Sequence, residues 1–469
     1  MITRSRTRVE ELAEFVVDAR WDDISDAARD ALKQRVLDAL GCAIGGLDGV
    51  PVRIIRDQVE EFGGKPLCTL IGGGRTGPDR AALYNGTAVR YLDFNDSYLA
   101  KGETCHPSDN LAPVLAASEY VHGHGRDVLT ALAVAYQVQC RLSDVAPVRA
   151  KGFDHTVQGA YSVAAGVARA LRLDATRTAN AVAIAGTAFN ALRVTRTGAL
   201  SNWKGLAFPN LGFAATQVTF LAMRGITGPL EVFEGNKGLM DAITGPFEIE
   251  WRREDLERVR MTILKKYNAE IHSQSTLEAV LELRAEHDLV AEDIARVDVE
   301  VFEVAYHIIG GGEEGGKQLV ATKEQADHSL PYLVAVALLD GQVTPAQYAA
   351  ERIRRQDVQD LLRRVIVRPD PELSARFPER HACRVHIHLR DGRVLSRAKE
   401  DYEGFHTRPA SWQMLVDKFM SLSRPVAGDS LSGEIADMVM RLDQVSIESL
   451  MSRLARVPHP LAAGDTGRM

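Results

Sequence analysis

The residues with the clearest chemical potential lie between Arg90 and Asn110, in the run RYLDFNDSYLAKGETCHPSDN. This run combines carboxylates, amides, hydroxyls and a lysine with His106. The Pro-Ser pair after His106 predicts that a helix begins there, capped by Ser108 or Asp109. Backbone N–H groups at a helix start favour anions. The run therefore indicates anion binding and proton transfer, with a capped polar loop as the structural alternative.

Two further segments place polar side chains beside helix-forming sequence. His155, in GFDHT, precedes a small-residue helix predicted from 159, and Lys204, in NWKG, occupies a Gly-bounded turn ahead of another. In DHSLPY, His328 and Tyr332 share a helical face if one helix includes both. Each of these residues also has a structural interpretation, as a core or capping histidine, a solvated loop lysine or a helix start.

A fourth segment, KKYNAEIHSQ at 265–274, lies where helical sequence gives way to mixed sequence. Glu270, His272 and Gln274 alternate, so they can share one face of an extended segment. Boundaries between domains are favoured ligand sites. The segment is therefore a further candidate for substrate contact.

The composition is that of an ordinary folded protein. The chain has 469 residues, of which 45% are hydrophobic and 25% charged, and this length favours two domains. The net charge of −7 does not indicate the basic surface that a nucleic-acid-binding protein needs. The most apolar stretch, 128–142, is too short to span a bilayer, and the N-terminus turns acidic before any apolar run, unlike a secretory signal.

The cysteines indicate a reducing compartment. There are 5, at scattered positions without a CxxC pair, which signals neither a disulfide framework nor a zinc or iron–sulfur site. We therefore expect a cytoplasmic protein that binds neither nucleic acid nor membranes.

Helical patterns dominate both ends of the chain and flank a mixed middle part. In the middle, residues 297–301 and 383–389 alternate as half-buried strands do, and Asp391-Gly392 is a strong hairpin turn signal. We predict a mainly α fold, with a large all-helical domain (1–267 and 408–469) and an inserted smaller α+β domain (268–407). The predicted helices lie at 126–143, 159–172, 176–190, 210–224, 274–287, 325–340, 410–423, 430–442 and 446–455.

Taken together, the motifs resemble the MmgE/PrpD family, which contains 2-methylcitrate dehydratase, cis-aconitate decarboxylase and iminodisuccinate epimerase. The segments that carry the resemblance, in the family's order, are RYLDFNDSYLAKGETCHPSDN, NWKGLAFPN, TGPLEVFEGNKG, KKYNAEIHSQ and DHSLPYLVAVALLDG. The resemblance implies that the α+β domain is a lid, that the protein is a homodimer, and that catalysis needs no metal or organic cofactor. HPSDN and LAKGETC look like the dehydratase pattern. We therefore expect a hydro-lyase that converts the tricarboxylate 2-methylcitrate to 2-methyl-cis-aconitate in propionate catabolism.

The resemblance also implies a set of site residues. The catalytic positions carry over to Asp93, His106, His155, Lys204, His272 and Tyr332, and the substrate-binding positions to Ser97, Lys101, Asn110, Glu270, Gln274 and His328. His272 is a candidate for the family's lid histidine. In the decarboxylase pattern, the position of that histidine aligns with Glu270 or Gln274.

The expected chemistry assigns roles to these residues. Removing a proton next to a carboxylate builds an electron-rich enediolate, so a cation must hold that carboxylate while a base and an acid move protons. We expect Lys204 and His155 to hold carboxylates. His106, oriented by Asp93, would act as base or acid, and Tyr332 or His272 would act as the opposite partner.

Three other functions remain compatible with the sequence. The first is a cis-aconitate decarboxylase or a related tricarboxylate lyase or epimerase of the same family. The second is a metal-dependent hydrolase that uses Asp93, Asp96 and His106. The third is a non-catalytic helical scaffold, although such a protein would have lost the polar cluster that this chain retains.

Overall fold

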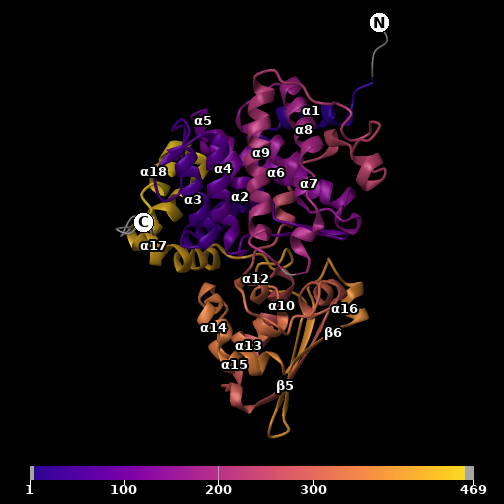
Figure 1. Cartoon of the computed structure of the whole chain (residues 1–469), viewed down its shortest axis with the longest axis vertical. Coiled ribbons are helices and arrows are strands. Elements are labelled where there is room, and N and C mark those ends of the chain that lie inside the picture. Colours follow the sequence, from indigo (N-terminus) through magenta and orange to yellow (C-terminus); the bar gives the residue numbers. More distant parts are fainter. Residues whose placement is uncertain (1–4, 199, 460–469) are drawn as a thin grey trace. The chain divides into compact units, whose positions relative to one another are not determined.

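The computed structural model describes residues 5–198 and 200–459 (Figure 1). Helices account for 59% of the described residues and strands for 10%, so the mainly α prediction is confirmed. The chain divides into two compact units. The first comprises residues up to 195, 203–262 and those from 411 onward, and the second comprises 196–202 and 263–410.

The first unit is built mainly of helices, and it joins segments from the two ends of the sequence. The segment α17 packs along α2, and the two approach closely because a Cβ on Gly41 or Gly45 would lie 3.1 Å from Phe419 or Leu422. The α-helices of this unit are α1 (Arg8–Asp18), α2 (Asp26–Gly45), α3 (Val50–Phe62), α4 (Pro78–Tyr91), α5 (Leu111–Tyr120), α6 (Gly125–Val145), α7 (Thr156–Ala170), α8 (Ala175–Ala188), α9 (Trp203–Met223), α17 (Trp412–Met440) and α18 (Ile447–Leu454).

Helix α9 is long and apolar enough to cross a membrane by length and composition, but 56% of its most apolar window is buried inside the protein. It packs against α4, α7 and α8. Such burial is typical of a core helix in a bundle. The helix begins at Trp203, earlier than the predicted start at 210, and it continues through Pro209.

The prediction of an all-helical domain is wrong in one respect, because the first unit also contains two short hairpins. The strands are β1 (Cys68–Thr69), β2 (Arg75–Thr76), β3 (Tyr98–Ala100) and β4 (Glu103–Cys105). In the second hairpin Tyr98 pairs with Cys105. Ser97 and His106, the residues just beyond that pair, are therefore brought opposite each other.

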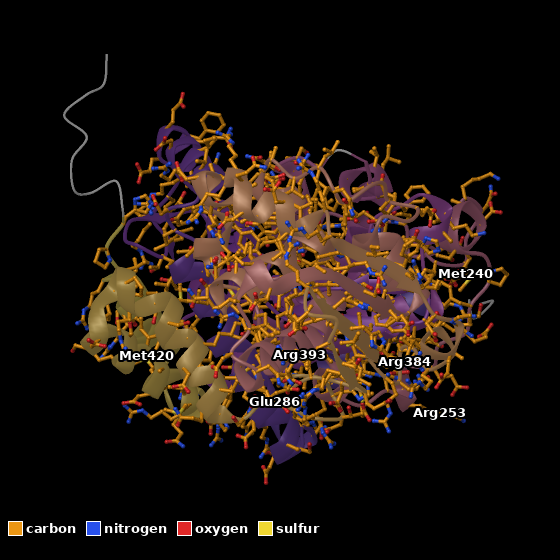
Figure 2. The ribbon with its side chains drawn as sticks, turned by 90° about the horizontal axis from the view of Figure 1, so that it is seen from below. Met240, Arg253, Glu286, Arg384, Arg393 and Met420 are labelled. Atoms are coloured by element: carbon orange, nitrogen blue, oxygen red, sulfur yellow. The ribbon has the colours of Figure 1, made fainter. Side chains whose placement is uncertain are left out.

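The second unit contains a four-stranded sheet in the order β6-β5-β7-β8. Its strands are β5 (Ile294–Val301), β6 (Val365–Pro369), β7 (Cys383–Leu389) and β8 (Val394–Lys399). The two strands predicted from alternation and the strand expected after the Asp391-Gly392 turn are present, whereas β6, which pairs in parallel with β5, was not predicted. On one face Arg384 of β7, labelled in Figure 2, lies opposite Glu300 of β5 and pairs with it at 3.2 Å.

The second unit also contains helices, and the helix predicted at 325–340 is interrupted between α12 and α13. The α-helices are α10 (Gln274–Glu286), α11 (Glu303–Ala305), α12 (Lys323–Ala326), α13 (Leu330–Asp340), α14 (Ala350–Arg354), α15 (Gln356–Leu362) and α16 (Pro371–Ala375). The Ser329 side chain caps α13 by accepting a hydrogen bond from the Tyr332 N–H at 3.2 Å. The expectation that His328 and Tyr332 share one helical face is therefore wrong, since His328 precedes the helix.

Buried ion pairs tie α10 to β8, and they predict acid sensitivity. Glu278 of α10 lies 2.8 Å from the Lys399 ammonium and 3.2 Å from that of Lys266, and it also pairs with Arg408. Burial alone would raise the pKa of Glu278, but its cationic partners outweigh burial and lower the pKa from 4.5 to about 2. The carboxylate therefore stabilises the fold above pH 4.5, and this contribution is lost as the pH falls toward 2.

We expect Glu278→Gln to reduce the free energy of unfolding at pH 7 and to lose less stability than the natural protein between pH 5 and pH 3. Urea denaturation at several pH values measures both quantities. Parallel stability curves for the two proteins would show that Glu278 does not contribute to the acid sensitivity.

Candidate active site

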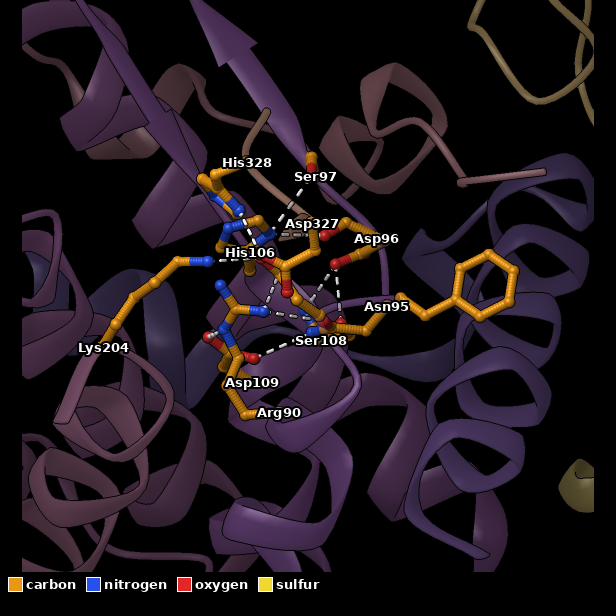
Figure 3. A network of polar contacts seen from close by, with 12 residues as sticks. Arg90, Asn95, Asp96, Ser97, His106, Ser108, Asp109, Lys204, Asp327 and His328 are labelled. Atoms are coloured by element: carbon orange, nitrogen blue, oxygen red, sulfur yellow. Dashed lines mark hydrogen bonds and ion pairs between the residues drawn. The ribbon is translucent and has the colours of Figure 1, made fainter. Parts of the chain in front are cut away.

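The β3–β4 hairpin positions His106, whose side chain is 9% exposed. Its Nδ1 lies 2.8 Å from the carbonyl oxygen of Asp96 and 3.1 Å from the Ser97 hydroxyl (Figure 3). Because a carbonyl only accepts hydrogen bonds, Nδ1 carries the proton and Nε2 is the basic nitrogen. The ring is thus oriented by a backbone carbonyl, where the sequence had predicted the Asp93 carboxylate.

Asp93 anchors a cluster of buried charges. It follows α4 with φ 53°, in the left-handed region that aspartate adopts far less often than glycine. Its carboxylate contacts the Arg90 guanidinium and lies 2.9 Å from the Lys204 ammonium. All three residues are at most 6% exposed. In this low-dielectric setting the two cations hold one carboxylate firmly.

Lys204 lies in the first turn of α9, so the expected Gly-bounded turn ahead of a helix is wrong. The residue is 6% exposed and paired with Asp93, which excludes the solvated loop lysine. In the structure Lys204 contacts a carboxylate of the protein, whereas the sequence had predicted a carboxylate of the substrate.

Sequence reasoning missed Arg90, which completes this cluster. Besides Asp93, its guanidinium contacts Asn95 Oδ1 at 3.3 Å and Asp109 at 3.6 Å. A basic residue in the last turn of a helix is common, since it offsets the helix dipole. The only signal for a second role was its spacing of three residues from Asp93.

Asp96 supports the segment around His106. Its Oδ1 accepts hydrogen bonds from the Ser108 N–H at 3.0 Å and hydroxyl at 2.7 Å, and its Oδ2 accepts one from the Tyr136 hydroxyl at 2.8 Å. Burial raises the pKa of Asp96. Both of its oxygens are engaged by neutral donors, so a metal site that combines Asp96 with Asp93 and His106 has no support in these contacts.

His155 lies beside His106. It occupies the residue before α7 and is 2% exposed, and its ring centroid lies 5.6 Å from that of His106 with the rings edge to face. Phe208 of α9 stacks on its other side at 6.1 Å. The helix start at Thr156 agrees with the prediction that His155 precedes a helix. The His155 ring lies between the His106 imidazole and the Phe208 ring.

Asn110 and Lys101 were expected to bind substrate, but they do not join this cluster. The Asn110 amide donates to Gln139 Oε1 at 2.7 Å and to the Pro107 carbonyl at 2.8 Å, and it accepts from the Ser162 hydroxyl at 2.9 Å. This side chain joins a 3₁₀ turn to α6 and α7, which is a structural role. Lys101 lies exposed in the turn between β3 and β4.

In the second unit Glu270 and His272 form a buried pair. His272 Nδ1 lies 2.7 Å from Glu270 Oε1, and the histidine is 1% exposed. Gln274 lies nearby in sequence, but its Oε1 accepts from the backbone N–H groups of Lys266 and Tyr267, at 2.9 and 3.0 Å. Its amide therefore shapes this loop, and the predicted substrate contact by Gln274 has no support here.

Tyr332 and His328 differ from their predicted settings. The Tyr332 hydroxyl donates to the carbonyl of Gln347, its side chain is fully buried in the core of the second unit, and burial raises its pKa. These contacts are those of a core tyrosine and do not support the predicted acid role. His328 is half-buried, and its Nδ1 lies 2.6 Å from Asp327.

The sequence is similar to several known proteins over most of its length. The chain is similar to mitochondrial 2-methylcitrate dehydratase of Yarrowia lipolytica, with 26% identity over 93% of this chain and 87% of that protein. It is 28% identical to 2-methylcitrate dehydratase of Cupriavidus necator, over 92% of this chain and 93% of that protein. It is 24% identical to mouse cis-aconitate decarboxylase, over 96% and 93% of the two chains.

Two domain models account for most of the sequence. The MmgE/PrpD N-terminal domain matches residues 10–252, and the MmgE/PrpD C-terminal domain matches residues 267–444. The chain therefore belongs to the MmgE/PrpD family, as the motifs had indicated.

Proposed function

We propose that this protein is a hydro-lyase that dehydrates 2-methylcitrate to 2-methyl-cis-aconitate, and that it acts in propionate catabolism as a cytoplasmic homodimer. The observation that carries the proposal is His106, buried with Nδ1 hydrogen-bonded to a backbone carbonyl and therefore basic at Nε2. The dehydratases of Yarrowia lipolytica and Cupriavidus necator, similar over most of their lengths, support the choice of substrate.

The proposed reaction is acid/base chemistry. His106 Nε2 removes a proton from the carbon next to a substrate carboxylate, the electron pair forms the new carbon–carbon double bond, and the hydroxyl leaves as water once an acid has protonated it. The negative charge that builds on the carboxylate needs nearby cations. Lys204 and Arg90 supply positive charge beside Asp93, and we assign the acid role to His272.

A second candidate is decarboxylation of cis-aconitate. The similarity to the mouse decarboxylase over nearly the whole chain favours it. Both reactions pass through an electron-rich carboxylate-stabilised species, so the same cluster serves either one. They differ in what leaves the substrate, which is water in one case and carbon dioxide in the other.

A substrate panel separates these candidates. We expect the purified protein, after exhaustive chelation, to eliminate water from 2-methylcitrate, with 2-methyl-cis-aconitate identified by mass spectrometry. Citrate, cis-aconitate and iminodisuccinate are the comparison substrates. Formation of itaconate from cis-aconitate would instead establish the decarboxylase. Activity that is lost on chelation and restored by a divalent metal would contradict the cofactor-free mechanism.

A further inference from the structure

We propose that Glu270 is a positioning residue: it keeps the proton on Nδ1 of His272, so that Nε2 is the atom through which His272 exchanges a proton with the substrate. The proton exchange rests on the proposed function, whereas the pairing of the two side chains does not. This role differs from the substrate contact that the sequence had predicted for Glu270.

The first support is the geometry of the pair, in which one carboxylate holds both the backbone and the ring of the same residue. Glu270 Oε2 accepts a hydrogen bond from the His272 backbone N–H at 2.7 Å, and Oε1 lies 2.7 Å from the ring Nδ1. The Ser273 hydroxyl donates to the Glu270 carbonyl at 2.6 Å, which closes the turn. Because both carboxylate oxygens of Glu270 contact His272, the orientation of the His272 ring is fixed.

The second support is the charge of Glu270, which is only 6% exposed. Burial by itself would raise its pKa, but His272 and then His328 and Lys265 outweigh burial and lower the pKa to about 2. The carboxylate is therefore ionised at neutral pH. An ionised carboxylate only accepts hydrogen bonds, so the proton between it and the imidazole lies on Nδ1.

The third support comes from the groups packed around the ring. Phe302 and Phe377 contact His272 at centroid distances of 5.6 and 5.9 Å, and His381 stacks on it at 6.2 Å. Burial and the neighbouring His272 lower the pKa of His381 to about 3, so His381 stays neutral. Its Nδ1 is 2.8 Å from the Ser275 hydroxyl.

Two ring nitrogens of this cluster are buried without a hydrogen-bond partner among the residues that the structure describes, His272 Nε2 and His381 Nε2. Of these two histidines, only His272 is paired with a carboxylate. A buried nitrogen without a partner is costly unless it has a ligand or a role in the reaction. Nε2 is therefore the atom of this pair suited to exchange a proton, and Glu270 acts on the substrate only through the ring.

The pairing is tested by nitrogen NMR of protein labelled in its histidines, with the His272 signal assigned from His272→Asn. We expect the ring to carry its proton on Nδ1 in the natural protein. In Glu270→Gln the share of the tautomer with its proton on Nδ1 should fall, because the carboxylate that holds this proton is gone. The matched control is Glu286→Gln at the exposed end of α10, labelled in Figure 2, which should leave the His272 tautomer unchanged.

Kinetics test the catalytic part of the proposal. We expect Glu270→Gln to lower kcat about 10-fold or more and to change KM less than about 3-fold. Glu270→Asp, which keeps the charge, should recover part of kcat, and Glu270→Ala replaces Glu270→Gln in both experiments if that variant does not fold.

Two results would overturn the inference. One is a neutral His272 with its proton on Nε2, or a tautomer ratio that is the same with and without the carboxylate. The other is a raised KM with unchanged kcat in Glu270→Gln, as expected of a residue that binds substrate directly. Because NMR needs no substrate, a failure of the proposed function would show separately, as a natural protein that turns over no tricarboxylate although His272 carries its proton on Nδ1.

Discussion

Replacing His106 with alanine should lower kcat by about 10²-fold or more, which is the usual contribution of a general acid or base. The ring is held by the Asp96 carbonyl and the Ser97 hydroxyl, so its Nε2 enters the reaction in a fixed orientation. Steady-state kinetics on the substrate identified by the panel measures the effect. Circular dichroism should be unchanged, because the hairpin strands retain their backbone pairing.

The matched control is His386→Ala, which removes a histidine from β7 that contacts Ser396 at 2.8 Å. We expect this variant to keep its kcat. A kcat close to normal in His106→Ala would show that His106 is a polar side chain ahead of a helix without a catalytic role.

Replacing Lys204 with methionine should lower kcat/KM by about 10²-fold or more and also destabilise the protein. The substitution keeps an apolar stem and removes a buried charge paired with Asp93 at 2.9 Å. Breaking such a pair costs about 3–5 kcal/mol when one charge remains buried alone, and less here because Arg90 still contacts the Asp93 carboxylate. If the ammonium stabilises the developing enediolate, kcat falls as well as kcat/KM.

A double variant separates the two effects. Adding Asp93→Asn to Lys204→Met removes the carboxylate that has lost one of its two cations, so we expect thermal stability to recover in part while kcat stays low. Recovery of both would show that Lys204 acts only through the fold. Unaltered KM, kcat and stability in Lys204→Met alone would contradict both the pairing and the proposed role.

Local sequence pattern predicted much of the secondary structure, and the misses have physical causes. The strands at 294–301 and 383–389 alternate because one face of each is buried, whereas 394–399 alternates only between exposed and half-buried side chains. The strand β6 does not alternate, since its side chains go from buried at Val365 to exposed at Pro369. Helix α9 begins before its predicted start because tertiary packing overrides the helix-breaking tendency of Gly205 and Pro209.

The site was predictable as a set of residues and not as a set of contacts. His106, His155 and Lys204 were found because their motifs resemble a family, and all three prove to be buried in the first unit. Their partners were not predictable, since Lys204 and Asp93 are 111 residues apart and the orienting group of His106 is a backbone carbonyl. Side-chain partners depend on the folded path of the chain, which a single sequence does not reveal.

The packing of α17 along α2 sets an order for assembly during synthesis. Asp38 and Lys418 form a buried pair at 2.6 Å, yet α2 leaves the ribosome long before α17 exists. Until then α2 presents an unpartnered groove at Gly41 and Gly45, beside a carboxylate whose pKa burial raises once the fold is complete. The sequence of the second unit lies between α2 and α17, so α2 cannot pair with α17 until the second unit has been synthesised.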